Sequence, residues 1–270
     1  MLEGGFCRFQ QHRGCEERLD PNPHIRATAG RVMISKVINR LFATNALILK
    51  YNDTEPAMEA VYRDLFLREL RSVGIEDVFY PVGASGNHSL LYFITRCLRE
   101  LPVKHILELG AGQSTLLISK LRAALHADFD VATIEHDSGW ADKIQAQIGH
   151  PLIRAALKAK TVGRFEIEYY DHPLISTGPE VDFLIIDGPP AYPDEQHLSR
   201  VGSLEIIEAR LAKDFIIVID DAQRRGEQTL VRGARSVLRR RGLAFKEASL
   251  RALKTQTVLA SGIFSEAAYF

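Results

Sequence analysis

The pattern of apolar and polar positions divides the chain into an N-terminal stretch without periodicity, two amphipathic helices, and a longer alternating region. Residues 1–30 follow neither the helical nor the strand period, so we expect a flexible leader that adds nothing to a core. Apolar residues recur at helical spacing over Val32–Lys50, and a second helix is expected over Thr54–Val73. Together these two helices predict an N-terminal helical cap over 31–80.

From residue 81 to 270, short apolar runs alternate with amphipathic stretches, which is typical of strands alternating with helices. Strands are expected at Val103–Leu109, Val131–Ile134, Phe165–Tyr170, Val181–Ile186, Phe215–Ile219, 243–247 and 255–260. Helices are expected at 88–100, Ser114–Ala124, Trp140–Ile148, Leu204–Leu211 and 228–241. The pattern therefore predicts an α/β domain, with a doubly wound, Rossmann-like, mostly parallel seven-stranded sheet and a C-terminal antiparallel strand pair.

Composition and charge narrow the partners and the compartment. The 270 residues carry 34 Lys plus Arg and 34 Asp plus Glu, so no bulk charge attracts the whole molecule to nucleic acid or anionic lipid. No apolar run approaches the ~20 residues of a membrane span, and the first thirty residues lack a signal peptide's apolar stretch. Three irregularly spaced cysteines favour a reducing setting. We therefore expect a cytoplasmic protein without nucleic-acid or membrane partners. Association into a homo-oligomer is compatible with these features.

Candidate ligand-binding residues follow the first two strands of the expected sheet, where such sheets bind their ligands. Gly110 and Gly112 allow a tight turn and a close approach of the backbone, and a helix begins directly afterwards. Glu135 ends the second strand, 23 residues beyond Gly112, where a carboxylate can accept the hydroxyls of a ribose. A dinucleotide loop would need a third glycine where Thr115 stands, which weakens that alternative.

The stretch Glu108–Thr115 (ELGAGQST) resembles the first motif of class I S-adenosylmethionine-dependent methyltransferases. Glu135 matches the ribose-binding acid of that family, and Asp187 in IIDGPP matches its motif after the fourth strand. The resemblance implies S-adenosylmethionine as cofactor and the matching fold over about residues 81–262. The cofactor-binding candidates are Glu108, Gly110, Gly112, Ser114, Thr115, Glu135, His136 and Asp187.

Three carboxylates, Asp187, Asp220 and Asp221, should end neighbouring strands and converge on one edge of the sheet. Close like charges need a cation or a proton to compensate them, and hard oxygen ligands suit Mg²⁺ or Mn²⁺. The arrangement is similar to cation-dependent O-methyltransferases, which carry an Asp-Asn pair after the fifth strand and a lysine after the aspartate of the fourth. Because Asp221 replaces that asparagine and the lysine is missing, we favour Asp187 and Asp220 as general bases without a metal. A divalent cation on the three carboxylates is the alternative.

These features predict a methyltransferase acting at oxygen on a small-molecule or glycan-like acceptor, since a hydroxyl nucleophile gains from a nearby base. Nucleobase methylation fits less well, because Gly188 separates Asp187 from the following prolines. The rival interpretations are a non-catalytic nucleoside-binding module and a Rossmann protein that binds a nicotinamide dinucleotide. The cluster of carboxylates disfavours a module that only binds a nucleoside, because placing like charges close together costs free energy and is typical of functional sites.

Overall fold

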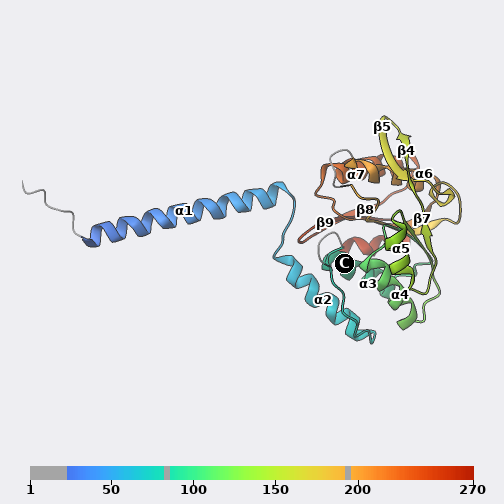
Figure 1. The fold of residues 1–270 in the computed structure, drawn as a ribbon, viewed down its shortest axis with the longest axis horizontal. Helices are drawn as coiled ribbons and strands as arrows, with labels where there is room; N and C mark the ends of the chain where they lie inside the picture. The colour runs from blue at the N-terminus through green and yellow to red at the C-terminus, as the bar shows by residue number, and fades with distance from the viewer. Residues whose placement is uncertain (1–22, 82–85, 192–195) are drawn as a thin grey trace, which may run out of the picture. The chain divides into compact units, whose positions relative to one another are not determined.

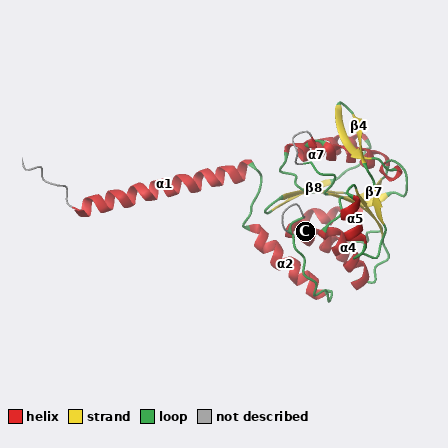
Figure 2. Ribbon diagram, viewed as in Figure 1, coloured by secondary structure: helices red, strands yellow, loops and turns green. Residues whose placement is uncertain are grey.

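The computed structural model describes residues 23–81, 86–191 and 196–270. The chain divides into two compact units, 1–48 and 49–270. The helix α1 (Pro23–Tyr51) accounts for the described part of the first unit, and Figure 2 shows it as one continuous helix. The helix predicted from Val32 is confirmed, but it begins earlier, so part of the expected leader is helical. Proline is tolerated in a first helical turn because its missing N–H has no intrahelical partner there.

The second unit is built on a seven-stranded sheet, which confirms the predicted fold class. Its strands are β1 (His105–Leu109), β2 (Asp130–Glu135), β3 (Leu152–Arg154), β6 (Val181–Ile186), β7 (Leu211–Ile219), β8 (Lys246–Arg251) and β9 (Thr255–Ala260). Their order across the sheet is β3-β2-β1-β6-β7-β9-β8. The first five run parallel, whereas β9 pairs antiparallel with both β7 and β8. The strand order reverses between β1 and β6, so a ligand site is expected beyond their carboxyl ends.

The prediction for the third strand of this sheet was wrong. That position is taken by β3, which has three residues and is too short to show a period of its own. The predicted strand Phe165–Tyr170 exists as β5, but it pairs with β4 (Leu157–Val162) in a separate two-stranded sheet. Alternation of apolar and polar residues identifies a half-buried strand without indicating which sheet the strand joins.

Helices cover both faces of the large sheet (Figure 1). They are α2 (Met58–Ser72), α3 (His88–Glu100), α4 (Gln113–Ala124), α5 (Ser138–Gln145), α6 (Leu204–Ala209) and α7 (Arg225–Arg240), with short 3₁₀ helices η1 (Pro173–Ile175), η3 (Ser199–Ser203) and η4 (Gly262–Tyr269). Alternation along β6 creates two cores, because successive side chains point to opposite faces. Phe183 and Ile185 join the core with α2, α3 and α4, whereas Leu184 and Ile186 join the core with α6 and α7.

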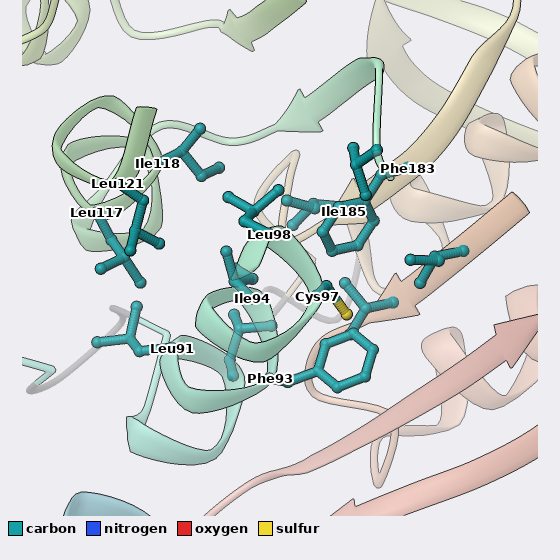
Figure 3. Close-up of a cluster of buried hydrophobic side chains, with 14 of the residues drawn as sticks. Leu91, Phe93, Ile94, Cys97, Leu98, Leu117, Ile118, Leu121, Phe183 and Ile185 are labelled. Carbon is teal, nitrogen blue, oxygen red and sulfur yellow. The ribbon is translucent and has the colours of Figure 1, made fainter. Parts of the chain in front are cut away.

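Figure 3 shows the first of these cores, where apolar side chains of α3 and α4 meet the strand β6. The rings of Phe93 and Phe183 pack edge to face, with 6.3 Å between their centroids. Cys97 lies in the same cluster and is a buried free thiol. Each large side chain buried in this way contributes roughly 1.5–3 kcal/mol, so α3 is held firmly against the sheet. No helix among the described residues is both long enough and apolar enough to cross a membrane.

A chain of polar side chains connects α2 to the carboxyl end of β7. Glu59 of α2 accepts hydrogen bonds from the Asn87 side chain at 2.6 Å and from the His88 amide at 2.8 Å. Gln256 of β9 donates to the Asn87 side-chain oxygen at 2.8 Å and to Asp220 at 2.6 Å. Asn87 and Gln256 are buried, so these bonds satisfy groups that water cannot reach.

Candidate active site

A cavity of about 350 Å³ opens at the carboxyl ends of β1, β2, β6 and β7. Its size falls within the range of small-molecule sites, and its position is the one expected from the strand order. The lining residues are Gly86, Gly110, Ala111, Gly112, Glu135, His136, Asp137, Trp140, Tyr170, Asp187, Gly188, Pro190, Arg200, Asp221 and Arg224. The cavity therefore brings together five of the eight candidate cofactor residues and two of the three clustered aspartates.

The loop after β1 crosses the loop after β6 at very short range. Gly110 has a φ of +90°, and a Cβ atom there would lie 3.0 Å from the backbone nitrogen of Gly188. A Cβ atom on Gly188 would lie 2.4 Å from the Tyr170 hydroxyl. Both positions therefore require glycine. At Gly112, by contrast, a Cβ atom would meet nothing within 4 Å, so this residue faces open space at the cavity.

We expect alanine to act differently at the two glycines of this loop. Gly110→Ala should lower the free energy of unfolding by about 1–3 kcal/mol, because a non-glycine residue is strained at positive φ and its Cβ meets backbone. Gly112→Ala should leave stability nearly unchanged and weaken ligand binding, because its Cβ would occupy the cavity. Urea denaturation and ligand titration of both variants measure the two effects, and equal destabilisation would contradict this assignment.

The amide groups of the same loop are already hydrogen-bonded within the chain. Gly110 donates to the Ile134 carbonyl and Ala111 to Glu135, each at 2.9 Å. Gly112 donates to the Thr115 hydroxyl at 2.9 Å. A pyrophosphate bound by this loop would need such amides free to donate. The loop is therefore poorly suited to a dinucleotide, which agrees with the missing third glycine.

Glu135 holds the loops after β1 and β2 together at the cavity wall. One carboxylate oxygen accepts from Ala111, and the other accepts from the His136 and Asp137 amides, both at 2.8 Å. A carboxylate offers about four acceptor positions, so one remains available on the oxygen that faces Ala111. The side chain is only 6% exposed. It is therefore a rigid acceptor, aimed by three backbone groups, at the edge of the cavity.

The remaining motif residues support the loop from behind. Glu108 is fully buried and accepts hydrogen bonds from the hydroxyls of Thr115 at 2.7 Å and Thr133 at 2.8 Å. Burial raises the pKa of Glu108 to about 7. Ser114 and Thr115 are also buried. Any part that these three residues have in cofactor binding is thus indirect, through the shape of the loop.

The three clustered aspartates converge as the sequence predicts. Oxygen atoms of Asp187, Asp220 and Asp221 all lie within 4.8 Å of one another, and they form a group of potential metal ligands within the described residues. Asp220 and Asp221 are almost completely buried, and Asp187 lines the cavity. A fourth carboxylate, Glu227 of α7, lies behind them, and burial raises its pKa to about 6.

Arg200 of η3 binds this carboxylate cluster from inside the protein. Its Nη2 donates to the Asp187 carbonyl at 2.6 Å and to the Asp187 carboxylate at 3.3 Å. Its Nη1 donates to the Asp220 carbonyl and the Asp221 carboxylate, each at 3.3 Å, and its Nε donates to the Pro189 carbonyl at 3.1 Å. The planar guanidinium thereby joins the carboxyl ends of β6 and β7, because each of its three nitrogen atoms donates a hydrogen bond there.

Two further cations complete the cluster. Lys254, from the turn between β8 and β9, places its ammonium 3.2 Å from Asp220 and 3.5 Å from Asp221. Arg224, which also lines the cavity, lies 3.0 Å from Asp221. Among the described residues, four carboxylates therefore face three cations, so a single proton would bring this group to neutrality.

The pKa values indicate where that proton resides. Burial and the Asp220 charge together raise the pKa of Asp187 well above its ordinary value, although Arg200 and Lys254 oppose this shift. Burial would also raise the pKa of Asp220, but Lys254, Gln256 and Arg200 outweigh it and lower that pKa. Of the two, Asp187 therefore binds a proton more readily, whereas Asp220 stays ionised more readily.

Sequence analysis missed Arg200, Lys254, Glu227 and Tyr170. Nothing in the residues around Arg200 marks it as buried, because its partners come from distant strand ends. Lys254 has the clearest signal, since the strand that follows it, β9, pairs with β7 and so brings it to the aspartates. Tyr170 ends a strand, and its buried hydroxyl at the cavity has no hydrogen-bond partner among the described residues. Such an orphaned hydroxyl is expected where a ligand binds.

No protein-family model matches this sequence, and no curated protein matches it. Solved structures are similar to the chain. A methyltransferase from Pyrococcus furiosus shares 14% identity over 74% of this chain and 98% of its own, with a TM-score of 0.43. A methyltransferase from Podospora anserina with bound S-adenosylhomocysteine shares 12% identity over 94% and 100%, with a TM-score of 0.41. An O-methyltransferase from Bacillus cereus, also with S-adenosylhomocysteine, shares 15% identity over 81% and 97%, with a TM-score of 0.38. The similarity is one of fold.

Proposed function

We propose that the chain is an S-adenosylmethionine-dependent methyltransferase that acts on a hydroxyl group of a small-molecule or glycan-like acceptor. The observation that carries the proposal is the cavity itself. It is lined by Glu135, a rigid carboxylate acceptor, and by Gly112, beside which there is open space. It is also lined by Tyr170, whose hydroxyl has no partner among the described residues, and by Asp187, whose carboxyl group is paired with that of Asp220. S-adenosylmethionine supplies, when bound, a methyl group activated by its positive sulfur.

The residues at the β1 and β2 end of the cavity suit the nucleoside part of that cofactor. Glu135 has one acceptor position left for a ribose hydroxyl, and Gly112 leaves room beside it. Trp140 donates from its indole nitrogen to the Ala111 carbonyl at 2.7 Å, which fixes an aromatic ring at the cavity wall. The occupied loop amides favour this cofactor over a dinucleotide.

The residues at the β6 and β7 end suit proton transfer from an acceptor hydroxyl. Burial and Asp220 raise the pKa of Asp187, so its carboxylate, when ionised, is a stronger base than an ordinary aspartate and can accept the proton of an acceptor hydroxyl. Arg200 fixes the position of Asp187 by binding both its carbonyl and its carboxylate. Methyl transfer needs mainly alignment, so a rigid base at this point is well placed.

Arg200 and Lys254 also bear on the metal alternative. The three aspartates would need to be largely unpaired to bind Mg²⁺ or Mn²⁺, yet Arg200 and Lys254 already form ion pairs with them. A divalent ion beside a guanidinium and an ammonium would be repelled by both. The residues present therefore fit an internally neutralised cluster better than a metal site, and we propose that the reaction needs no metal.

Calorimetric titration tests the proposed cofactor. S-adenosylhomocysteine should bind the wild-type protein, and NAD should not. Glu135→Ala should raise the Kd for S-adenosylhomocysteine about 5- to 150-fold, since it removes a buried acceptor worth roughly 1–3 kcal/mol. Glu166→Ala, which changes an exposed carboxylate on β5, is the matched control and should have no effect. Tight NAD binding, or an unchanged Kd in Glu135→Ala, would refute the proposed cofactor.

A further inference from the structure

The helix α1 carries a continuous apolar surface that faces solvent. At 100° per residue, Ile34, Val37, Ile38, Leu41, Phe42 and Ile48 fall within an arc of about 140° around the helix axis. Each of these side chains is between 44% and 68% exposed. Between Ile34 and Ile48, Asn45 is the one polar residue inside the arc. An apolar surface this exposed is expected to be covered by a partner.

The charge of α1 is entirely positive. Its 29 residues include Arg26, Arg31, Lys36, Arg40 and Lys50 and no Asp or Glu. Lys36, Arg40 and Lys50 lie on the side of the helix opposite the apolar arc. Because the whole chain has a net charge of zero, this concentration of positive charge is invisible in the overall composition.

We propose that α1 binds an anionic lipid surface, with its axis along the membrane and its apolar arc at the boundary between headgroups and acyl chains. Between Ile34 and Lys50, α1 has an apolar arc on one side and basic residues as its only charged groups on the other, which is the composition of such interfacial helices. Each basic residue near an anionic bilayer adds about 1 kcal/mol of attraction, and long basic side chains can reach the headgroups from the polar side. This proposal revises the expectation of no membrane partner, which rested on the charge of the whole chain and on the lack of an apolar run long enough to span a bilayer.

A second copy of α1 fits these features less well than lipid does. A stable coiled coil needs an apolar repeat sustained over at least three to four heptads, whereas the arc from Ile34 to Ile48 covers about two. The arc is also wider than the narrow seam of a coiled coil. Two identical helices with five positive charges each would repel one another, whereas an anionic surface attracts the helix.

Sedimentation with lipid vesicles tests the proposal on the full chain. The protein should pellet with vesicles of phosphatidylcholine mixed with phosphatidylserine and not with phosphatidylcholine alone, and added salt should weaken the binding. Leu41→Gln should weaken binding roughly tenfold or more, since it removes one large apolar side chain from the buried arc. Leu47→Gln is the matched control, because Leu47 is equally exposed, at 68% against 65%, but lies outside the arc.

Three results would overturn the proposal. The first is the absence of binding to phosphatidylserine vesicles, and the second is an equal loss of binding in Leu41→Gln and Leu47→Gln. The third is a dimer, measured by light scattering, that Leu41→Gln converts to a monomer while vesicles bind neither form. None of these readouts depends on the cofactor or on catalysis, so they are independent of the proposed methyltransferase activity.

Discussion

Arg200→Met should destabilise the protein by about 3–5 kcal/mol, because it leaves buried carboxylates without their main cation. Asp187 and Asp221 lie 3.3 Å from the guanidinium and Glu227 lies 3.5 Å from it. Urea denaturation at pH 7 measures the loss. Arg225→Met removes the same charge from an exposed position on α7 and should change stability by less than ~0.5 kcal/mol.

The pH dependence of this variant separates a lost ion pair from lost packing. Without Arg200, the buried carboxylates gain protons more readily in the folded state, so their folded pKa values rise above the unfolded ones. Folding then binds protons, and the stability of the variant relative to wild type should fall as pH rises from about 5 to 8. A difference between the two proteins that stays constant over this range would mean that Arg200 contributes through packing alone.

Asp187→Asn should reduce turnover at least about 100-fold, because asparagine cannot take the proton of an acceptor hydroxyl. The Kd for S-adenosylhomocysteine should remain nearly unchanged, since the proposed nucleoside contacts lie at the β1 and β2 end of the cavity. The measurement is release of S-adenosylhomocysteine with a hydroxylated acceptor identified by screening. Asp64→Asn, at an exposed position on α2, is the control and should retain full turnover.

The same assay tests the metal-free interpretation. Wild-type turnover should be insensitive to a chelator and to added Mg²⁺ or Mn²⁺, because Arg200 and Lys254 already form ion pairs with the aspartates. Loss of turnover with the chelator, restored by Mg²⁺, would contradict this interpretation and favour the three aspartates as metal ligands. Retention of turnover in Asp187→Asn would exclude this carboxylate as the base.

The sequence predicts most of the large sheet because five of its strands are apolar runs or sit between clear helical periods. Prediction from the sequence fails where a strand is too short to show a period, or where its pattern fits more than one place in the fold. The three residues of β3 are too few to show a period. Apolar and polar residues alternate along β5 as they would in an edge strand of the large sheet, so its pattern does not reveal that it belongs to another sheet. The predicted helix Leu204–Leu211 ends at Ala209, because Leu211 already begins β7. The predicted strand 243–247 lies at Lys246–Arg251 instead, because apolar Leu243 and Phe245 pack beside α7 without pairing.

The candidate site is predictable where its residues follow a strand, and not where a residue reaches the site from another part of the chain. Gly110, Glu135 and Asp187 can be found because strand ends meet at one edge of the sheet. Arg200 comes from a 3₁₀ helix, and no local pattern distinguishes it from a surface arginine. Whether a charged side chain is buried depends on residues from distant parts of the sequence that pack around it, and the local pattern of apolar and polar residues does not show these contacts.

The polar chain from Glu59 through Asn87 and Gln256 to Asp220 links the helix α2 to the carboxylate cluster. Glu59 lies in α2, within the helical cap that the sequence assigns to a separate segment. Removing α2 would take Glu59 away from the buried Asn87, which in turn accepts from Gln256, the neutral donor that helps to keep Asp220 ionised. The compact unit that begins at Leu49 therefore includes α2, and α2 shares one hydrogen-bonded network with the carboxylate cluster.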